Sequence, residues 1–417
     1  MAVSEPDGQP DLAPQRWHSF RAFRNGTFRH LWAGIIVNGF AVWINRLTVG
    51  WFIFDQTDSA LLTAVSFTMG SAPGVLFAPF GGAIADRIDR RYVLATAAVM
   101  KGLTSLCVAL VAVDGIESAW PIIALLAVAG AMNSFELPSS QALIPDVTGP
   151  RDAMNGIAVC SVGLRGISAV GALTGGFLLE LYGAPFAFMT AAFLHGLAAI
   201  IVIRLRVPPR PIHPDTPRRS VIADTKEGLR IMASLPTVRA LLIMTLLVEV
   251  LCFSYASVLP VLARDRLGLD ESDLGTLTAM GGFGSFLGAL CLAGMSEYRR
   301  KGLMVIVIAA LYGSSIVALG LSDLFMLSLV VVTIVGMMAA IFDALQWGLL
   351  QANVPDALRG RVLGGWMLAV SFGWIGHGEL GIVSDAIGVH WAYAINGGLI
   401  IAVAVVALLA VKSLRRA

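Results

Sequence analysis

Charged residues are scarce in this sequence of 417 residues. They make up 13% of it, against 57% hydrophobic residues and a mean hydropathy of +0.79. Soluble domains carry about 25% charged residues, so a soluble chain of this length would lack the charges needed to cover its surface. The net charge of +2 is too small for binding to a polyanion. These shortages exclude an ordinary soluble enzyme, a disordered chain and a nucleic-acid-binding protein, and they leave a polytopic membrane protein.

Cysteines are also few. The four cysteines are far apart, lie in apolar stretches and form no CxxC pair: Cys107, Cys160, Cys252 and Cys291. We therefore expect neither a disulfide framework nor a metal site, and we interpret the cysteines as small core residues. No P-loop, HExxH or GxSxG motif is present, so the sequence supports neither ATP hydrolysis nor an enzymatic reaction.

Long apolar runs fill most of the chain. Each is about 20 residues long, and the period-2 alternation of a membrane β-barrel is missing, so the runs predict membrane-spanning helices. The sequence therefore predicts an all-α membrane protein with twelve spans. We place them near residues 31–54, 60–84, 92–113, 119–143, 153–179, 184–204, 238–262, 272–295, 303–321, 324–350, 361–384 and 389–411.

The distribution of Lys and Arg predicts the orientation. Nearly all of these residues outside the spans fall in connections on the side of the N-terminus, whereas the opposite side has only Arg264 and Arg266. Because cytoplasmic loops are enriched in Lys and Arg, both termini are expected in the cytoplasm. The absence of a basic start followed at once by an apolar run argues against a cleaved signal peptide.

The chain divides into two halves at its one long loop. Residues 206–237 hold five prolines within 208–217 and separate six spans from six. We expect a tail and interfacial segment (1–30), a six-helix bundle (31–205), a cytoplasmic linker (206–237), a second six-helix bundle (238–411) and a tail (412–417). A repeat supports this division: QALIPD at 141–146 and QANVPD at 351–356 share four of six positions at an offset of 210.

The most specific motif is GGAIADRIDRR at 81–91, between the second and third spans. It combines small residues for close helix approach with an acid and a basic cluster. This motif resembles the loop 2–3 signature of the major facilitator superfamily, over residues 25–411. The resemblance implies that Asp86 sits against the N-terminus of the eleventh helix, where the helix dipole favours an anion. It further implies that Asp86, Arg87, Arg90 and Arg91 are conformational-switch residues.

Within the superfamily, three further segments resemble the bacterial enterobactin-exporter-like and macrolide-efflux-like branch: FRHLW at 28–32, LIPD at 143–146 and VPDALRGR at 354–361. The resemblance implies a multi-pass protein of the bacterial cytoplasmic membrane. It would export a small amphiphilic molecule, such as a siderophore or a hydrophobic drug, by alternating access and proton antiport.

The implied partners are that substrate and the lipid bilayer, without nucleic acid. We expect a monomer with no cofactor. Two alternatives stay open, namely a lipid or lysophospholipid flippase and a non-transporting membrane sensor.

Ionisable residues inside the spans are the candidates for substrate binding and proton coupling, because charge in a bilayer is costly. They are Arg46, Glu136, Arg165, Glu249, Asp343, His377 and Glu379, with Lys101 favoured as a structural residue. At about 1.5 Å per residue, Arg165, Glu249 and Asp343 fall at similar depths and could share a layer. Glu136 lies in the cytoplasmic half, where it is expected to pair with basic loop residues.

Two histidines and several aromatic residues on the predicted spans also bear on the predicted function. His377 and Glu379 are two residues apart, so they should not share a helix face, and His195 is expected to be a hydrogen-bonded bundle residue. Aromatic residues on the predicted central spans would suit an amphiphilic or aromatic solute: Trp43, Trp51, Phe67, Phe135, Phe253, Tyr255, Phe283, Trp347, Trp366 and Trp374.

Overall fold

The computed structural model describes residues 20–207, 230, 234–294, 300–354, 366, 369–411, 414 and 415, with the backbone alone for 78–87, 293 and 294. No strand occurs in this part of the chain. Its first half comprises η1 (Arg21–Arg24), α1 (Gly26–Thr57), α2 (Ala60–Arg87), α3 (Arg90–Val111), α4 (Trp120–Thr148) and α5 (Ala153–Ile203). Its second half comprises α7 (Pro236–Leu251), η2 (Phe253–Ser257), α8 (Leu259–Val261), η3 (Leu262–Arg266), α9 (Glu271–Gly294), α10 (Lys301–Gly320), α11 (Phe325–Ala352), α13 (Gly373–Ile387) and α14 (Val389–Ala410).

Ten stretches of the described chain are long and apolar enough to cross a membrane. One of them, α5, has 51 residues and is broken at Gly183, whose φ of 78° and ψ of 172° are not helical. A residue with a side chain rarely adopts such a φ, and Pro185 follows two positions later. The two parts of α5 correspond to the predicted fifth and sixth spans. The described part of the predicted eleventh span, α13, has 15 residues. Each predicted span thus overlaps a helix, and the count of twelve crossings stays a prediction.

The seventh span was predicted near 238–262, and residues 236–257 are long and apolar enough to cross a membrane, but the span is not one regular helix. Helix α7 ends at Leu251, and η2, α8 and η3 follow it as short segments. The side chain of Ser254 donates to the Val250 carbonyl at 2.8 Å, and that of Ser257 donates to the Ser254 carbonyl at 2.8 Å. These bonds and Pro260, which has no amide donor, favour a break in the helix.

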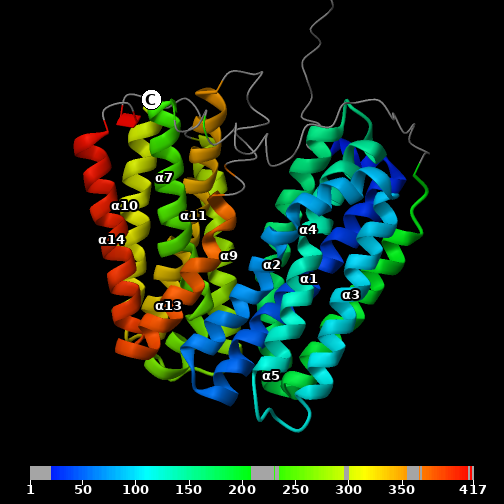
Figure 1. Cartoon of the computed structure of the whole chain (residues 1–417), viewed down its shortest axis with the longest axis horizontal. Coiled ribbons are helices and arrows are strands. Elements are labelled where there is room, and N and C mark those ends of the chain that lie inside the picture. The colour runs from blue at the N-terminus through cyan, green and yellow to red at the C-terminus, as the bar shows by residue number, and fades with distance from the viewer. Residues whose placement is uncertain are drawn as a thin grey trace, which may run out of the picture.

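The helices form two groups (Figure 1). Helices α1–α5 make up one, and α7, α9, α10, α11, α13 and α14 make up the other. We call them the first and the second bundle. The bundles approach each other at one end of the molecule and stand apart at the other, where both the start of α1 and the C-terminus lie. The predicted linker, 206–237, falls largely outside the described residues.

Small residues bring the bundles together at the closed end. Gly176 of α5 crosses α9, and an added Cβ there would stand 2.7 Å from the Glu271 carbonyl oxygen. Gly381 of α13 crosses α2, and its Cβ would stand 2.5 Å from the Ala64 methyl carbon. A side chain at either glycine would push the backbones apart, so glycine at these positions permits close contact between the two bundles.

Asp385, in the last turn of α13, adds a polar contact at this end. Its carboxylate accepts hydrogen bonds from the backbone N–H groups of Ala60 at 2.7 Å and Leu61 at 3.1 Å, and from the Ser59 hydroxyl at 3.0 Å. These groups form the N-terminus of α2, which favours an anion. An acid of the second bundle therefore caps a helix of the first.

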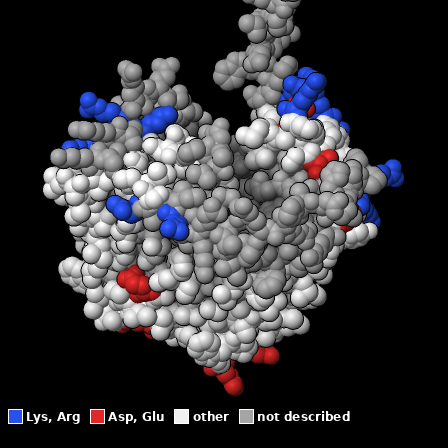
Figure 2. Space-filling view, turned by 45° about the horizontal axis from the view of Figure 1, so that its top comes forward, with Lys and Arg blue, Asp and Glu red and all other residues white. Residues whose placement is uncertain are grey.

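The surface agrees with a protein that crosses a membrane. Figure 2 shows Lys and Arg side chains, with some Asp and Glu among them, around the end at which the bundles stand apart, and Asp and Glu at the opposite edge. Large apolar side chains are exposed on the outer faces of the helices, among them Leu110, Phe193 and Leu409. Lipid is the solvent that such surfaces require. The positive-inside rule then predicts that the wide end faces the cytoplasm.

Candidate functional site

A cavity of about 780 Å³ lies between the two bundles. Leu94, near the start of α3, and Val202, near the end of α5, line it toward the wide end, whereas Pro260 and Leu274 line it toward the closed end. We call this space the central cavity. Because both bundles contribute to its wall, a rocking of one bundle against the other would change its access.

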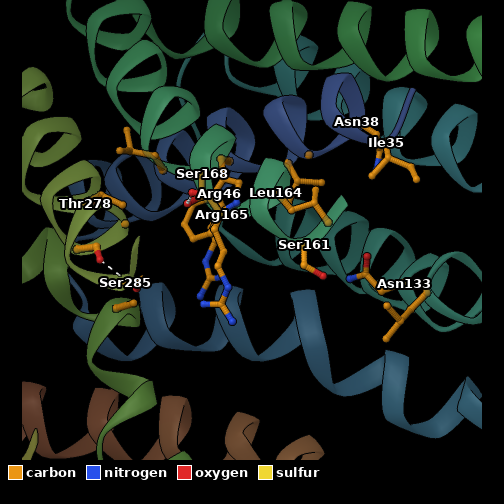
Figure 3. Close-up of a pocket in the computed structure, with 18 of the residues that line it drawn as sticks. Ile35, Asn38, Arg46, Asn133, Ser161, Leu164, Arg165, Ser168, Thr278 and Ser285 are labelled. Carbon is orange, nitrogen blue, oxygen red and sulfur yellow. Dashed lines mark hydrogen bonds between the residues drawn. The ribbon is translucent and has the colours of Figure 1, made fainter. Parts of the chain in front are cut away.

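Two arginines of the first bundle project into the central cavity. Arg46 of α1 lies with its guanidinium carbon 5.3 Å from the Trp43 ring centroid and 5.1 Å from that of Phe67. Arg165 of α5 also lines the cavity, and Figure 3 shows it and Ser168 beside α9. Both arginine side chains are exposed to the cavity. In the part of the chain that the structure describes, neither has a carboxylate oxygen within 4.0 Å.

The other cation of the cavity wall is paired. The Lys101 ammonium of α3 forms an ion pair with Glu136 of α4, which also accepts a hydrogen bond from the Asn38 side-chain amide at 2.7 Å. The side-chain carbonyl oxygen of Asn38 lies 2.9 Å from Nδ1 of His195. Because this oxygen can only accept, Nδ1 is the donor of the hydrogen bond. His195 is a hydrogen-bonded bundle residue, as expected. The expected pairing of Glu136 with loop residues is wrong, because Lys101 approaches it from a neighbouring helix.

The two acids of the second bundle lie behind the cavity wall. Glu249 is 9% exposed and packs on the start of α13, where an added Cβ at Gly373 would stand 3.4 Å from its Oε2. Asp343 accepts a hydrogen bond from the Gln346 amide at 3.1 Å. The charge of Asp343 acts on Glu249, and that of Arg165 acts on Asp343. The three predicted residues therefore interact electrostatically, but of them only Arg165 is among the residues lining the central cavity.

His377 and Glu379 point to different surroundings, as their spacing predicted. The His377 ring lies 6.1 Å from that of Phe67, and it lines a second cavity of about 340 Å³ that Arg46 also lines. Glu379 accepts a hydrogen bond from the Asn396 side chain at 2.9 Å. His377 is thus placed beside the central cavity, while Glu379 is held against α14.

The loop between α2 and α3 is described in part. The side chains of Asp86 and Arg87 lie outside the described ones. Arg90 forms an ion pair with Asp146 and donates to the Ala142 carbonyl at 2.9 Å, so it ties α3 to the repeated segment at the end of α4.

Arg91 forms an ion pair with Asp89, the N-cap of α3. Hydrogen bonding from Arg91 holds the pKa of the Asp89 carboxyl below its usual range. In this conformation, the described switch residues Arg90 and Arg91 make contacts within the first bundle.

Among the described residues, neither the cysteines nor the potential metal ligands form a further functional site. All four cysteines are free thiols. Cys160 and Cys252 are buried, whereas Cys107 and Cys291 are exposed, so the expectation that all four are core residues is wrong for two. Among the described residues, no three His, Cys, Asp or Glu side chains are grouped so as to hold a metal ion.

Two helical bundles around a shared central cavity are the arrangement of a membrane transporter. The model of the family "Transmembrane secretion effector" matches residues 17–416, and the chain belongs to this family. It is 23% identical over 359 residues to the staphyloferrin A transporter of Staphylococcus aureus, covering 85% of this chain and 89% of that protein. It is also 22% identical over 384 residues to macrolide efflux protein A of Streptococcus pyogenes, covering 91% and 94%.

A third relative is the enterobactin exporter EntS of Shigella boydii, 25% identical over 312 residues, which cover 75% of this chain and 74% of that protein. These relatives confirm the efflux branch that the sequence segments indicated. Among solved structures, a point mutant of the nucleoside transporter NupG superposes with a TM-score of 0.74 at 15% identity, covering 92% of this chain and 99% of that one. The peptide-transporter-family protein PepTSo superposes with a TM-score of 0.71 at 14% identity, covering 93% and 98%. These similarities confirm the fold.

Proposed function

We propose that this protein is a secondary active exporter of a small amphiphilic organic molecule, of the siderophore or hydrophobic-drug kind, in the bacterial cytoplasmic membrane. The observation that carries the proposal is the central cavity, which is enclosed by both bundles and extends toward the wide end. A cavity of about 780 Å³ suits an organic solute, since ligand pockets typically measure about 300–1,000 Å³. Each cycle would load this cavity from the cytoplasm and empty it outside, with one monomer as the working unit.

The proton gradient is the proposed energy source. Glu249 and Asp343 interact at a depth where charge is costly, and Arg165 acts on Asp343 from the other bundle. Movement of the first bundle away from the second would remove the field of Arg165 from Asp343 and thereby favour protonation of the acid. This arrangement supports coupling between bundle movement and proton binding.

The test is flux in proteoliposomes that hold the purified protein under an imposed pH gradient. Staphyloferrin A, enterobactin and erythromycin serve as candidate cargoes, and a fluorescent lysophospholipid serves as the lipid probe. We expect uphill movement of at least one soluble cargo, collapse of that movement by a protonophore, and none in protein-free liposomes. Movement of the lipid probe alone would identify a flippase, and no movement of any probe would favour a sensor; either result would overturn the proposal.

A further inference from the structure

The ionisable side chains that line the central cavity carry an excess of positive charge. Among the described lining residues, three are cations and one is a carboxylate: Arg46, Lys101, Arg165 and Glu136. Lys101 and Glu136 form an ion pair and cancel each other. Arg46 and Arg165 remain without a carboxylate within 4.0 Å among the described residues.

This arrangement disfavours a cationic cargo. A buried cation needs a carboxylate or an aromatic cage to replace its water. The carboxylate of the described cavity wall, Glu136, is already engaged by Lys101 and by the Asn38 amide. Trp43 and Phe67 present their rings to Arg46, a cation of the protein itself. Asp343 acts electrostatically on Arg165 but does not line the cavity.

The same features favour an anion. A guanidinium offers five N–H donors in a planar fork that fits the two oxygens of a carboxylate and can also donate to a phenolate oxygen. In a partly dehydrated cavity, two such groups without acids raise the local concentration of anions. Arg46 comes from α1 and Arg165 from α5, and both line the same cavity, so the two guanidinium groups can act on one ligand (Figure 3).

The rest of the cavity wall indicates what kind of molecular frame an anionic ligand would have. Aromatic and aliphatic side chains occupy most of it, including Phe253, Leu164 and Leu274. Hydroxyl groups add polar points to the wall, such as those of Thr278 and Ser285, which Figure 3 shows opposite Arg165. Both hydroxyls donate to backbone carbonyls, so they offer a ligand their oxygen atoms as acceptors. A wall of this kind fits an aromatic or aliphatic frame with some polar substituents.

We propose that the cargo is an organic dianion, with one ionised acidic group bound by Arg46 and a second by Arg165 on an apolar or aromatic frame. This inference rests on the proposed export function and specifies the substrate class of the same cavity. Carboxylates and phenolates are the acidic groups that it includes. Hydrophobic cations are excluded.

Equilibrium binding to the purified protein in detergent tests the inference without any gradient. Carboxyfluorescein and rhodamine 123 share a xanthene frame and differ in charge, which makes them matched anionic and cationic probes. Measured by fluorescence anisotropy, carboxyfluorescein is expected to bind at least tenfold more tightly than rhodamine 123. Increased salt should weaken its binding, because the charges are partly exposed. Equal binding of the two dyes, tighter binding of rhodamine 123, or binding of neither would overturn the inference.

Variants then assign the two contacts. R46Q and R165Q should each weaken carboxyfluorescein binding at least tenfold, whereas R46K and R165K, which keep the charge, should lose less. R165E should shift the preference toward rhodamine 123. The matched control is R204Q, since Arg204 is exposed at the end of α5, outside the cavity lining. Unchanged anion binding in both R46Q and R165Q would contradict the assignment.

The outcomes separate this inference from the proposed function. Anion binding that depends on both arginines, without flux of any cargo, would contradict the export function and support the inference of an anionic ligand. Gradient-driven flux of rhodamine 123, but not of carboxyfluorescein, would keep the export function and remove the inference.

Discussion

Charged residues inside the bilayer have different roles in this protein, and their partners decide which. Lys101 and Glu136 form a pair that Asn38 extends to His195. Arg46 and Arg165 face the central cavity with no carboxylate oxygen within 4.0 Å among the described residues. Residue type and depth alone did not distinguish these cases, because the partner of each charge comes from another helix.

The first prediction at this scale concerns coupling. E249Q and D343N each remove a proton-binding group near the interface of the bundles. Neutralising the coupling acid should abolish uphill, pH-driven flux in proteoliposomes, whereas cargo binding should survive because the cavity lining is unchanged. E117Q, at an exposed acid outside the cavities, is the matched control. If both variants concentrate cargo as the unmodified protein does, neither acid is the coupling site, and Glu136 and Glu379 become the candidates.

The second prediction concerns the Lys101–Glu136 pair. The Lys101 side chain is 6% exposed, so E136Q leaves a buried ammonium without its carboxylate. Breaking a buried pair in this way costs about 3 kcal/mol, and we expect a clear fall in thermal stability in detergent. The double variant with Met at 101 and Leu at 136 should recover most of this loss, because it removes both charges. Equal stability of E136Q and the unmodified protein would show that the pair contributes nothing.

At the scale of the element, helix ends and helix breaks position the functional groups. The break after α7 places Phe253 and Tyr255 of η2 in the cavity wall. The Tyr393 hydroxyl donates to the Tyr255 carbonyl at 2.7 Å, and the same carbonyl accepts from the Val258 N–H at 3.3 Å. Irregular backbone is tolerated at membrane depth where protein or a cavity surrounds it, as it is here.

A third prediction follows from the cap that Asp385 forms on α2. D385N weakens an anion–dipole contact and a helix cap between the bundles, together worth about 1 kcal/mol. We expect the closed end to open in a larger fraction of molecules. Spin labels at Gln56 and Leu321, both exposed at that end, report the separation of the bundles by electron–electron distance measurement.

D323N is the control for that experiment. Asp323 is also at the closed end, but it forms its ion pair with Arg266 of the same bundle. The distance distribution should therefore stay unchanged in D323N and gain a longer component in D385N. Identical distributions in the two variants would rule out a latch at Asp385.

At the scale of the whole molecule, the described conformation is closed at one end and wide at the other. Gly176, Gly381 and Asp385 hold the closed end, each through a contact with the opposite bundle. The family resemblance assigns Asp86 to a contact of the same type at the wide end. The two acids would then act on opposite sides of one equilibrium.

The fourth prediction tests this opposition. D86N should destabilise the state in which the wide end is closed, by about 0.3–1 kcal/mol. Transport should fall with little loss of folded protein, and a cysteine introduced at Ser161, in the cavity wall, should react faster with a thiol reagent applied from the wide side. The four native cysteines are first replaced. D152N is the matched control, since Asp152 lies at the same end and forms its ion pair with Arg21 of its own bundle. Unchanged labelling together with full transport would contradict the role of Asp86.

The sequence by itself determined the class of protein, the approximate position of each span and the branch of the superfamily. These properties depend on hydropathy, on the distribution of Lys and Arg and on short motifs, all of which are local along the chain. For the same reason, the sequence analysis named the four charged residues among the described residues of the cavity wall, namely Arg46, Lys101, Glu136 and Arg165.

Only the tertiary structure decided which of these residues act together. In the tertiary structure, Glu136 pairs with Lys101 and Glu249 lies behind the cavity wall. The helix of the seventh span is interrupted, and Asp385 lies at the start of α2. Each of these outcomes depends on which helix faces meet, and the meeting residues are separated by tens to hundreds of positions. Periodicity within one helix carries no information about its neighbour, so no pattern in the sequence could have supplied them.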